Sequence, residues 1–342
     1  MLRSLTSGRR RVFTLLGSVS VMVALALAVM APAVVVAQAT RTWVSGVGDD
    51  ANPCSRTAPC KTFPGAIAKT AAGGEINCID PGGFGTVTIT KAITIDCEET
   101  EAGVLASGTN GIVVNAGPND IVTLRELDID GIGANNVGTG INGIKFIAGG
   151  ALHVQEVLIR NFRGGGSGID FEPTGNSELY VDDSDISANG SSATTGGIVV
   201  RPTGTGTANV VIDGVHLENN SSGFIADGTS STGIAANFNI QNSTISGNSN
   251  NGISAISATN DAGISGMVRD CTVSANVSVG ISANGVTASG KGSAIIRVGG
   301  SSISQNVTGV SSVGSGQVRS YTSNQVNGNL GGESFAGNDA LK

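Results

Sequence analysis

Aromatic residues are scarce in this chain of 342 residues: they make up 4%, with one Trp, two Tyr and nine Phe. Protein surfaces that bind sugars commonly stack them on exposed aromatic rings, and the few rings here share no position of the repeat described below. The chain has only two His, and its five Cys form no Cys-x-x-Cys pair. These shortages argue against a metal site built from Cys and His.

Basic residues are also few, and four of the 19 lie near the start, at Arg3, Arg9, Arg10 and Arg11. An apolar run over 12–36 follows, and then the small-residue cleavage pattern Ala-Gln-Ala. We therefore predict a signal peptide over 1–39 and a secreted protein, periplasmic or extracellular. The alternative is an uncleaved membrane anchor, since the run is long enough to span a bilayer.

Removing residues 1–39 would leave 15 basic and 26 acidic residues, a net charge of −11. An acidic chain with scattered Lys and Arg is a poor candidate for binding phosphate backbones or anionic membranes. We expect no nucleic-acid partner, and membrane contact only through an uncleaved signal.

One pattern, a Gly followed by an apolar residue, recurs about every 28 residues, which is typical of stacked supersecondary units. The glycines are Gly111, Gly143, Gly168, Gly197, Gly223, Gly252, Gly280 and Gly309. Between them stands a repeated aliphatic residue: Ile129, Ile159, Ile186, Leu217, Ile245, Val273, Ile303 and Val326. The residue two places earlier is mostly apolar or small, and the one between is mostly polar. This alternation predicts a strand with one face inward.

Three residues after most of these aliphatics comes an asparagine: Asn189, Asn220, Asn248, Asn276, Asn306 and Asn329. A short amide side chain tolerates a left-handed turn, so six independent surface turns are one interpretation. Stacked amides can also bond to each other along a ladder. We favour an internal asparagine ladder because the six positions align.

A coil of about 28 residues suits three short parallel strands that rise about 4.8 Å per coil. The phrase Ser-x-Ile-x-x-Asn followed by Gly-Ile, over roughly 111–329, resembles the right-handed parallel β-helix proteins of the pectate-lyase-like superfamily. The resemblance implies an all-β, right-handed parallel β-helix, a solenoid of about ten coils. It implies little about activity, because this architecture hosts many functions.

Residues 40–74 resemble the start of many secreted β-helix proteins. A strand around Trp43 leads to a loop rich in Gly, Asp and Asn, and then to Lys61-Thr62-Phe63 and a short apolar-patterned segment. We expect a helix of two to three turns that caps the N-terminal coil. The β-helix itself would occupy 75–342.

Four of the five cysteines are placed to form two disulfides. Cys54 and Cys60 enclose five residues, and Cys78 and Cys97 have inward parity on what should be neighbouring coils. An oxidising compartment permits both bridges. Cys271 aligns with an inward position, so we expect a buried free thiol.

A group of acidic residues suggests a metal site. We place Glu126, Asp128, Glu156, Asp183 and Asp185 on outward positions of successive coils, with His216 next to them. Carboxylates one coil apart repel each other unless they are solvated or bridged, and Ca²⁺ takes several carboxylate oxygens at once. The alternative is a solvated acidic stripe that keeps the solenoid soluble. We expect no other cofactor.

Catalytic motifs of related enzymes are missing. Polygalacturonase-like members carry Asn-Thr-Asp, an Asp-Asp pair, Gly-His-Gly and Arg-Ile-Lys, of which only Asp182-Asp183 is present. The Arg-x-Pro-x-x-Arg of pectate-lyase-like members is not satisfied at Arg201-Pro202. We therefore expect a non-catalytic scaffold or binding protein, associated with a polysaccharide or a cell-envelope component. The alternatives are a lyase or hydrolase that acts on acidic polysaccharide with Ca²⁺, and a surface adhesin.

Overall fold

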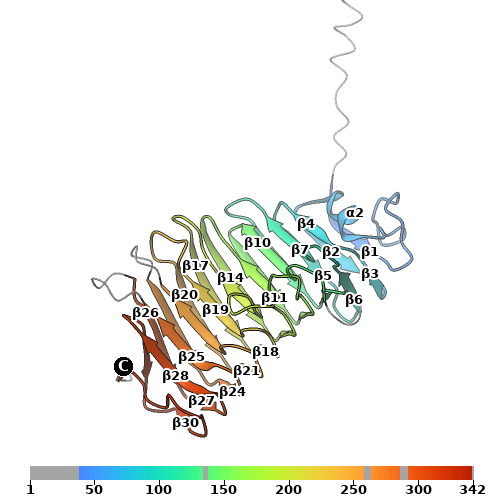
Figure 1. The fold of residues 1–342 in the computed structure, drawn as a ribbon. Coiled ribbons are helices and arrows are strands. Elements are labelled where there is room, and N and C mark those ends of the chain that lie inside the picture. The colour runs from blue at the N-terminus through green and yellow to red at the C-terminus, as the bar shows by residue number, and fades with distance from the viewer. Residues whose placement is uncertain (1–37, 134–137, 258–262, 286–291, 341–342) are drawn as a thin grey trace, which may run out of the picture. The chain divides into compact units, whose positions relative to one another are not determined.

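The computed structural model describes residues 38–133, 138–257, 263–285 and 292–340 (Figure 1). The predicted signal peptide therefore lies, apart from its last two residues, outside the described part of the chain. Residues Ala39–Lys342 form one compact unit. No helix among the described residues is both long and apolar enough to cross a membrane.

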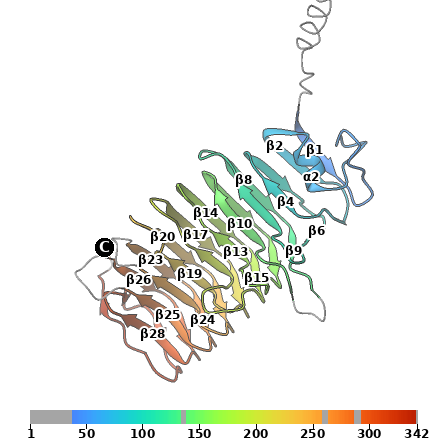
Figure 2. The ribbon, with the colours of Figure 1, turned by 45° about the horizontal axis from the view of Figure 1, so that its top comes forward.

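Three parallel sheets build this unit, and within each sheet neighbouring strands come from successive coils (Figures 1 and 2). The twelve-stranded sheet contains β1 (Ala39–Val44), β2 (Thr70–Cys78), β5 (Ile93–Asp96), β8 (Ile121–Arg125), β11 (Ala151–Gln155), β14 (Asn176–Asp182), β17 (Thr207–Asp213), β20 (Ala236–Gln241), β23 (Ile264–Arg269), β26 (Ala294–Gly299), β29 (Gln317–Ser320) and β31 (Gly337–Asn338).

The two other sheets have shorter strands. The ten-stranded sheet contains β3 (Gly82–Gly83), β6 (Ala102–Leu105), β9 (Asp128–Asp130), β12 (Leu158–Arg160), β15 (Asp185–Ser187), β18 (His216–Glu218), β21 (Thr244–Ser246), β24 (Thr272–Ser274), β27 (Ser302–Ser304) and β30 (Gln325–Val326). The nine-stranded sheet contains β4 (Val87–Ile89), β7 (Ile112–Asn115), β10 (Ile144–Ala148), β13 (Ile169–Phe171), β16 (Ile198–Val200), β19 (Phe224–Asp227), β22 (Ile253–Ile256), β25 (Val279–Asn284) and β28 (Thr308–Val313).

One coil visits the three sheets in a fixed order, as β14, β15 and β16 do. Alternate side chains point inward: Leu179 and Val181 on β14 and Ile186 on β15 are fully buried. The predicted right-handed parallel β-helix is confirmed. Among the described residues nine coils contribute a strand to every sheet, and the tenth lacks its strand in the nine-stranded sheet, which agrees with the expected ten coils.

The repeated glycine marks where successive coils approach each other most closely. A Cβ atom added to Gly168 would lie 2.7 Å from the carbonyl oxygen of Gly197 in the next coil, and one on Gly252 would lie 2.7 Å from that of Gly280. Real Cβ contacts are not this short, so any side chain would force the coils apart. The period in the sequence therefore follows from backbone packing between coils.

The N-terminal segment is joined to the β-helix rather than separate from it, because β1 pairs with β2 at the end of the twelve-stranded sheet. The helix α2 (Phe63–Ile67) has five residues, fewer than the two to three turns expected. Thr62 caps it by accepting a hydrogen bond from the Gly65 N–H. Pro64 at the start suits a first turn, and helix geometry ends at Ala68. Phe63 and Ala66 are buried in the core, so this short helix packs onto the start of the β-helix.

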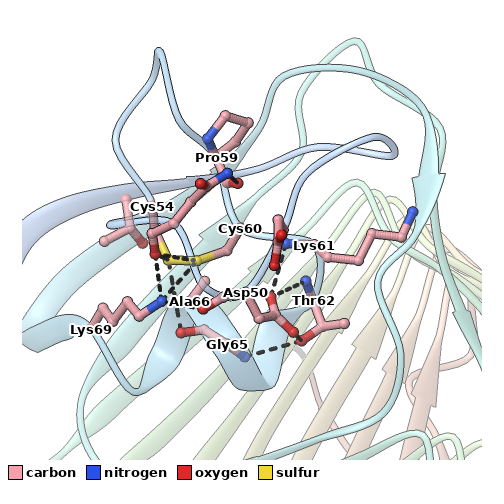
Figure 3. The surroundings of a disulfide bond; sticks show 12 residues. Asp50, Cys54, Pro59, Cys60, Lys61, Thr62, Gly65, Ala66 and Lys69 are labelled. Carbon is pink, nitrogen blue, oxygen red and sulfur yellow. Dashed lines mark hydrogen bonds between the residues drawn. A yellow bond between two sulfur atoms is a disulfide. The ribbon is translucent and has the colours of Figure 1, made fainter.

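Both expected disulfides are present, Cys54–Cys60 and Cys78–Cys97, and Cys271 is a buried free thiol. Figure 3 shows the first bridge beside α2. In the same loop the Asp50 carboxylate accepts hydrogen bonds from the main-chain N–H groups of Lys61 and Thr62 at 2.8 and 2.9 Å. Loop, bridge and helix are thus fastened together without a large apolar core of their own.

Candidate functional site

The structure separates the acidic residues predicted to bind a metal into two kinds of position. Glu126, Glu156 and Asp183 lie in the turn between the twelve-stranded and ten-stranded sheets, with positive φ angles of 51°, 54° and 44°. Asp128 lies two residues after Glu126 and Asp185 two residues after Asp183, at the starts of β9 and β15. The side chains of Glu126, Glu156 and Asp183 are all at least partly exposed, but they belong to the turn and not to a strand.

These acidic residues have partners of their own. Arg160 forms ion pairs with Asp128 at 2.8 Å and with Asp130 at 2.9 Å. Glu126 accepts a hydrogen bond from the Glu99 N–H at 2.8 Å, and Asp185 lies 3.3 Å from His216.

Glu156, Asp183 and Asp185 line a shallow hollow of about 450 Å³. No group of three His, Cys, Asp or Glu side chains among the described residues could hold a metal ion. The geometry therefore does not assemble the predicted five-residue site, and Ca²⁺ stays a prediction from sequence.

The six aligned asparagines form a continuous row of hydrogen bonds. Five are buried, and Asn329 at the end is partly exposed. Asn248 Nδ2 donates to Asn276 Oδ1 at 2.8 Å and to the Leu217 carbonyl at 3.1 Å. The row occupies the turn between the ten-stranded and nine-stranded sheets, inside the coil. It is a structural element, and no ligand can reach its buried amides.

The outward face of the twelve-stranded sheet carries a second continuous row, which the repeat analysis did not predict. Parallel register places one residue of each successive strand side by side. We call this the polar row: Trp43, Asn77, Asp96, Arg125, Gln155, Asp182, Asp213, Gln241 and Arg269. Its members stand about 4.8 Å apart, the spacing of neighbouring strands.

Hydrogen bonds link many members of the polar row. Arg125 donates to Gln155 Oε1 at 3.0 Å. Further along, Gln241 Nε2 donates to Asp213 Oδ2 at 2.6 Å, and Arg269 Nε donates to Gln241 Oε1 at 2.9 Å. These contacts hold long side chains in fixed positions, so the row offers an ordered set of donors and acceptors.

At the middle of the row two carboxylates, Asp182 and Asp213, stand on adjacent strands with unequal surroundings. Burial raises the pKa of Asp182, and the negative charges of Asp213 and Asp183 raise it further, against a hydrogen bond from Gln155. Hydrogen bonds from Gln241 and Asn242 lower the pKa of Asp213. The surroundings therefore shift the pKa values of these two neighbouring carboxyl groups in opposite directions.

Two rings stand near these carboxylates on the same face of the sheet: Tyr180 is two residues before Asp182 on β14, and His153 pairs with Tyr180 from β11. His153 and Tyr180 stack with ring centroids 4.6 Å apart and planes 8° apart. The Tyr180 hydroxyl donates to Glu178 Oε2 at 2.9 Å, and this hydrogen bond raises the pKa of Tyr180. The stack fixes both rings over the sheet.

Trp43 begins the row at a hollow of about 560 Å³, which Arg56, Glu98 and Glu99 also line. The Arg41 guanidinium lies 5.8 Å from the centroid of the Trp43 ring. The only Trp of the chain thus stands in the same row as the carboxylate pair. The repeat in the sequence does not include this Trp, because β1 precedes the first repeat.

A separate charged network lies on the outward face of the nine-stranded sheet. The Asp170 side chain is only 5% exposed and binds Lys145 and Arg201 at 2.8 and 2.9 Å. Glu172 also contacts both cations. Each cation is matched by two carboxylates, so this network fastens neighbouring coils and offers no unpaired cationic group.

Comparison with known proteins agrees with this architecture. The chain is similar to the crystal structure of the pectate lyase Pel9A, with a TM-score of 0.58 and 16% identity, over 88% of this chain and 78% of that one. The chain has the parallel β-helix fold of that lyase. A second match is the A-module of the mannuronan C-5 epimerase AlgE4 of Azotobacter vinelandii, with a TM-score of 0.39, 14% identity and coverage of 79% and 91%. No family model and no curated protein matches the sequence.

Proposed function

We propose that the polar row binds a neutral, hydroxyl-rich polysaccharide that lies along the β-helix axis, and that the protein works outside the cytoplasm. The observation that carries this proposal is the row itself: eight polar residues and one Trp at a single register position on successive strands. A repeating array of this kind suits a repeating, extended ligand. The two disulfides support an oxidising compartment.

The charges around the polar row indicate which class of polymer it would bind. Asp182 and Asp213 stand at its centre, with Glu178 and Asp183 near them, and Arg125 and Arg269 are already engaged by neighbours. An acidic polymer would meet repulsion there unless a cation bridged it. Sugar hydroxyls, in contrast, donate well to carboxylates, and such charge-assisted hydrogen bonds are about twice as strong as neutral ones.

The test is binding of the mature protein to a panel of soluble neutral glucans, galactans and mannans, followed by electrophoresis in gels that contain the polymer. We expect at least one to retard the protein. Asp213→Asn and Trp43→Ala should each weaken that binding roughly tenfold, as expected when one charged hydrogen bond or one ring contact is lost. Asp185→Asn, on the ten-stranded sheet, is the matched control and should bind like the wild type.

Failure of every neutral polymer to bind, or unchanged binding by both variants, would refute the proposal. Retardation by acidic polymers alone, dependent on added Ca²⁺, would instead favour the acidic-polysaccharide alternative.

A second candidate function is cleavage of the same polymer, and the observation that favours it is the divergent pKa values of Asp182 and Asp213. General acid–base catalysis needs one protonated and one ionised group near the scissile bond. Its test is the appearance of new reducing ends, as hydrolysis of a neutral polymer produces, during incubation with the bound polymer. Activity that is lost in Asp182→Asn while binding persists would establish turnover.

A further inference from the structure

The last strand of the twelve-stranded sheet, β31 (Gly337–Asn338), has only two residues and lies at an edge. Two main-chain hydrogen bonds hold it to β29: Ala336 N–H to the Val318 carbonyl at 2.9 Å and Asp339 N–H to the Ser320 carbonyl at 2.8 Å. Most residues around it are exposed. Backbone pairing of this length is weak by itself, so side-chain contacts must determine whether the strand stays docked.

The main side-chain contact is a carboxylate held by two guanidinium groups. Arg319 Nε and Nη2 lie 2.8 and 2.7 Å from Asp339 Oδ1, and Arg297 Nε lies 3.0 Å from Oδ2. Arg319 Nη2 also donates to the Asn338 carbonyl at 3.0 Å. Two arginines therefore converge on one carboxylate and on the main chain beside it, which is a recognition geometry rather than a single surface ion pair.

The pairing of β31 with β29 also restricts which residues can precede Asp339. A Cβ atom at Gly337 would lie 2.8 Å from Arg319 Nη1, so the guanidinium lies directly over a residue without a side chain. Phe335, two residues earlier, packs partly buried against the core. The docked segment thus presents an aromatic anchor, a glycine and a carboxylate at alternate positions.

We call the pair Arg297 and Arg319 the arginine clamp. Next to it is a hollow of about 830 Å³, lined by Met267, Arg269, Tyr321 and Gly299 together with Arg297 and Asp339. Ala340 also lines it, so the hollow borders the end of the docked segment.

We propose that the edge of β29, with Arg297 and Arg319, is a docking site for an extended acidic peptide, and that residues 335–339 occupy it as an internal ligand. The internal ligand shows the chemistry: main-chain pairing at a sheet edge gives affinity, and the Phe-x-Gly-x-Asp pattern gives specificity. A free carboxylate compound would gain the arginines but not the strand pairing. The site therefore favours a peptide over a small acid or an acidic glycan.

In this geometry the internal segment competes with any added peptide for the same site. The internal segment is tethered, so an incoming peptide must overcome a high local concentration of the segment. Repelling Asp339 from the clamp removes that competition and leaves the arginines and the β29 edge in place. The site should then accept in trans the sequence that it normally holds in cis.

The test uses the whole chain carrying Asp339→Lys and a fluorescent peptide, Glu-Ser-Phe-Ala-Gly-Asn-Asp-Ala, which copies residues 333–340. Fluorescence anisotropy should show at least tenfold tighter binding to the variant than to the wild type. A peptide with Asn in place of its Asp should bind at least tenfold more weakly. Adding Arg319→Glu to the variant should abolish binding.

The matched control is Asn338→Lys, which adds a positive charge to the adjacent residue but keeps Asp339 in the clamp. It should bind the peptide no better than the wild type. Equal binding of the Asp and Asn peptides would overturn the proposal, as would Asp339→Lys binding no more tightly than Asn338→Lys. Displacement of the internal segment by polygalacturonate but not by the peptide would overturn the assignment to peptides.

A second measurement does not depend on a variant that might misfold. Hydrogen exchange at the amides of Ala336 and Asp339 in the wild type should accelerate at least several-fold in excess Asp-containing peptide, because the peptide displaces both donors. The Asn peptide should leave their exchange unchanged. Equal acceleration by both peptides would contradict recognition through the carboxylate.

Discussion

Asn220 Oδ1 accepts two hydrogen bonds from Asn189 in the preceding coil, one from its main-chain N–H at 2.9 Å and one from its side-chain amide at 3.1 Å. The same side-chain amide also donates to the Ile159 carbonyl at 3.1 Å. The Asn189 amide therefore satisfies a buried carbonyl of the preceding coil, and the Asn220 oxygen satisfies the Asn189 N–H in the same way. An apolar side chain at these positions would leave those backbone groups without a partner.

Asn248→Asp is expected to lower stability by at least about 2 kcal/mol, because a carboxylate cannot donate to Asn276 or to the Leu217 carbonyl and buries a charge. Urea unfolding at neutral pH measures the cost. Asn237→Asp, at an exposed position on β20, is the control and should change stability by less than about 0.5 kcal/mol. Equal effects of the two changes would mean that the ladder contributes little.

Ile245→Asp tests the inward column of aliphatic residues. Ile245 is fully buried at the centre of β21, so an unpaired carboxylate there should cost several kcal/mol or prevent folding. Thr244→Asp, its outward neighbour on the same strand, is the matched control and should be tolerated. Melting temperatures of the two variants compare the faces directly, and an unchanged value for Ile245→Asp would be inconsistent with the buried column.

The sequence predicted the coil well because its period has a local cause. Gly168 must lack a side chain next to the Gly197 carbonyl, so the glycine recurs from coil to coil. Asn189 supplies an amide to the same turn, and an asparagine recurs at this position in six successive coils. Residues fixed by contacts with the adjacent coil leave a periodic trace. The Cys78–Cys97 disulfide could be predicted for a related reason, since inward parity limits which cysteines of neighbouring coils can meet, and Cys54–Cys60 could be predicted because only five residues separate the two.

The polar row, in contrast, does not recur with a fixed period in the sequence. Asp182 and Asp213 are 31 residues apart, whereas Asp213 and Gln241 are 28 apart, because the loops before each strand of the twelve-stranded sheet differ in length. Outward residues also face solvent and vary from coil to coil. The register of this sheet therefore had to come from the structure.

Removing the Cys78–Cys97 bridge with paired Ser substitutions should cost about 3 kcal/mol, the loop-closure value for a bridge over a separation of 19 residues. The bridge joins Cys78 at the end of β2 to Cys97 just after β5, and so links the first two coils of the β-helix. Cys271→Ser, at a buried thiol outside any bridge, is the control for the chemical change. Urea unfolding measures both variants, and a reductant should bring the wild type to the stability of the double variant if no other bridge contributes. Equal stability of the double variant and the wild type would show that the bridge is not stabilising.

The unequal carboxylates of the polar row predict opposite dependences of stability on pH. The pKa of Asp182 in the folded protein is above the ordinary value of 3.8, so its contribution to stability is complete below that value and is lost as the pH rises through the raised pKa. The pKa of Asp213 is lowered, so its contribution is present above 3.8 and is lost as the pH falls through the lowered pKa.

Asn substitutions at the two positions separate these contributions, because an amide does not titrate. Asp182→Asn should gain stability relative to the wild type as the pH rises above about 4. Asp213→Asn should lose stability relative to the wild type as the pH rises toward about 4, and this deficit should remain at higher pH. Melting temperatures from pH 3 to 8 measure both differences. An effect of the amide itself would shift a curve equally at every pH, so the slope of each difference is the deciding quantity. Parallel curves for both variants would contradict the unequal environments, and with them the basis for acid–base chemistry at this pair.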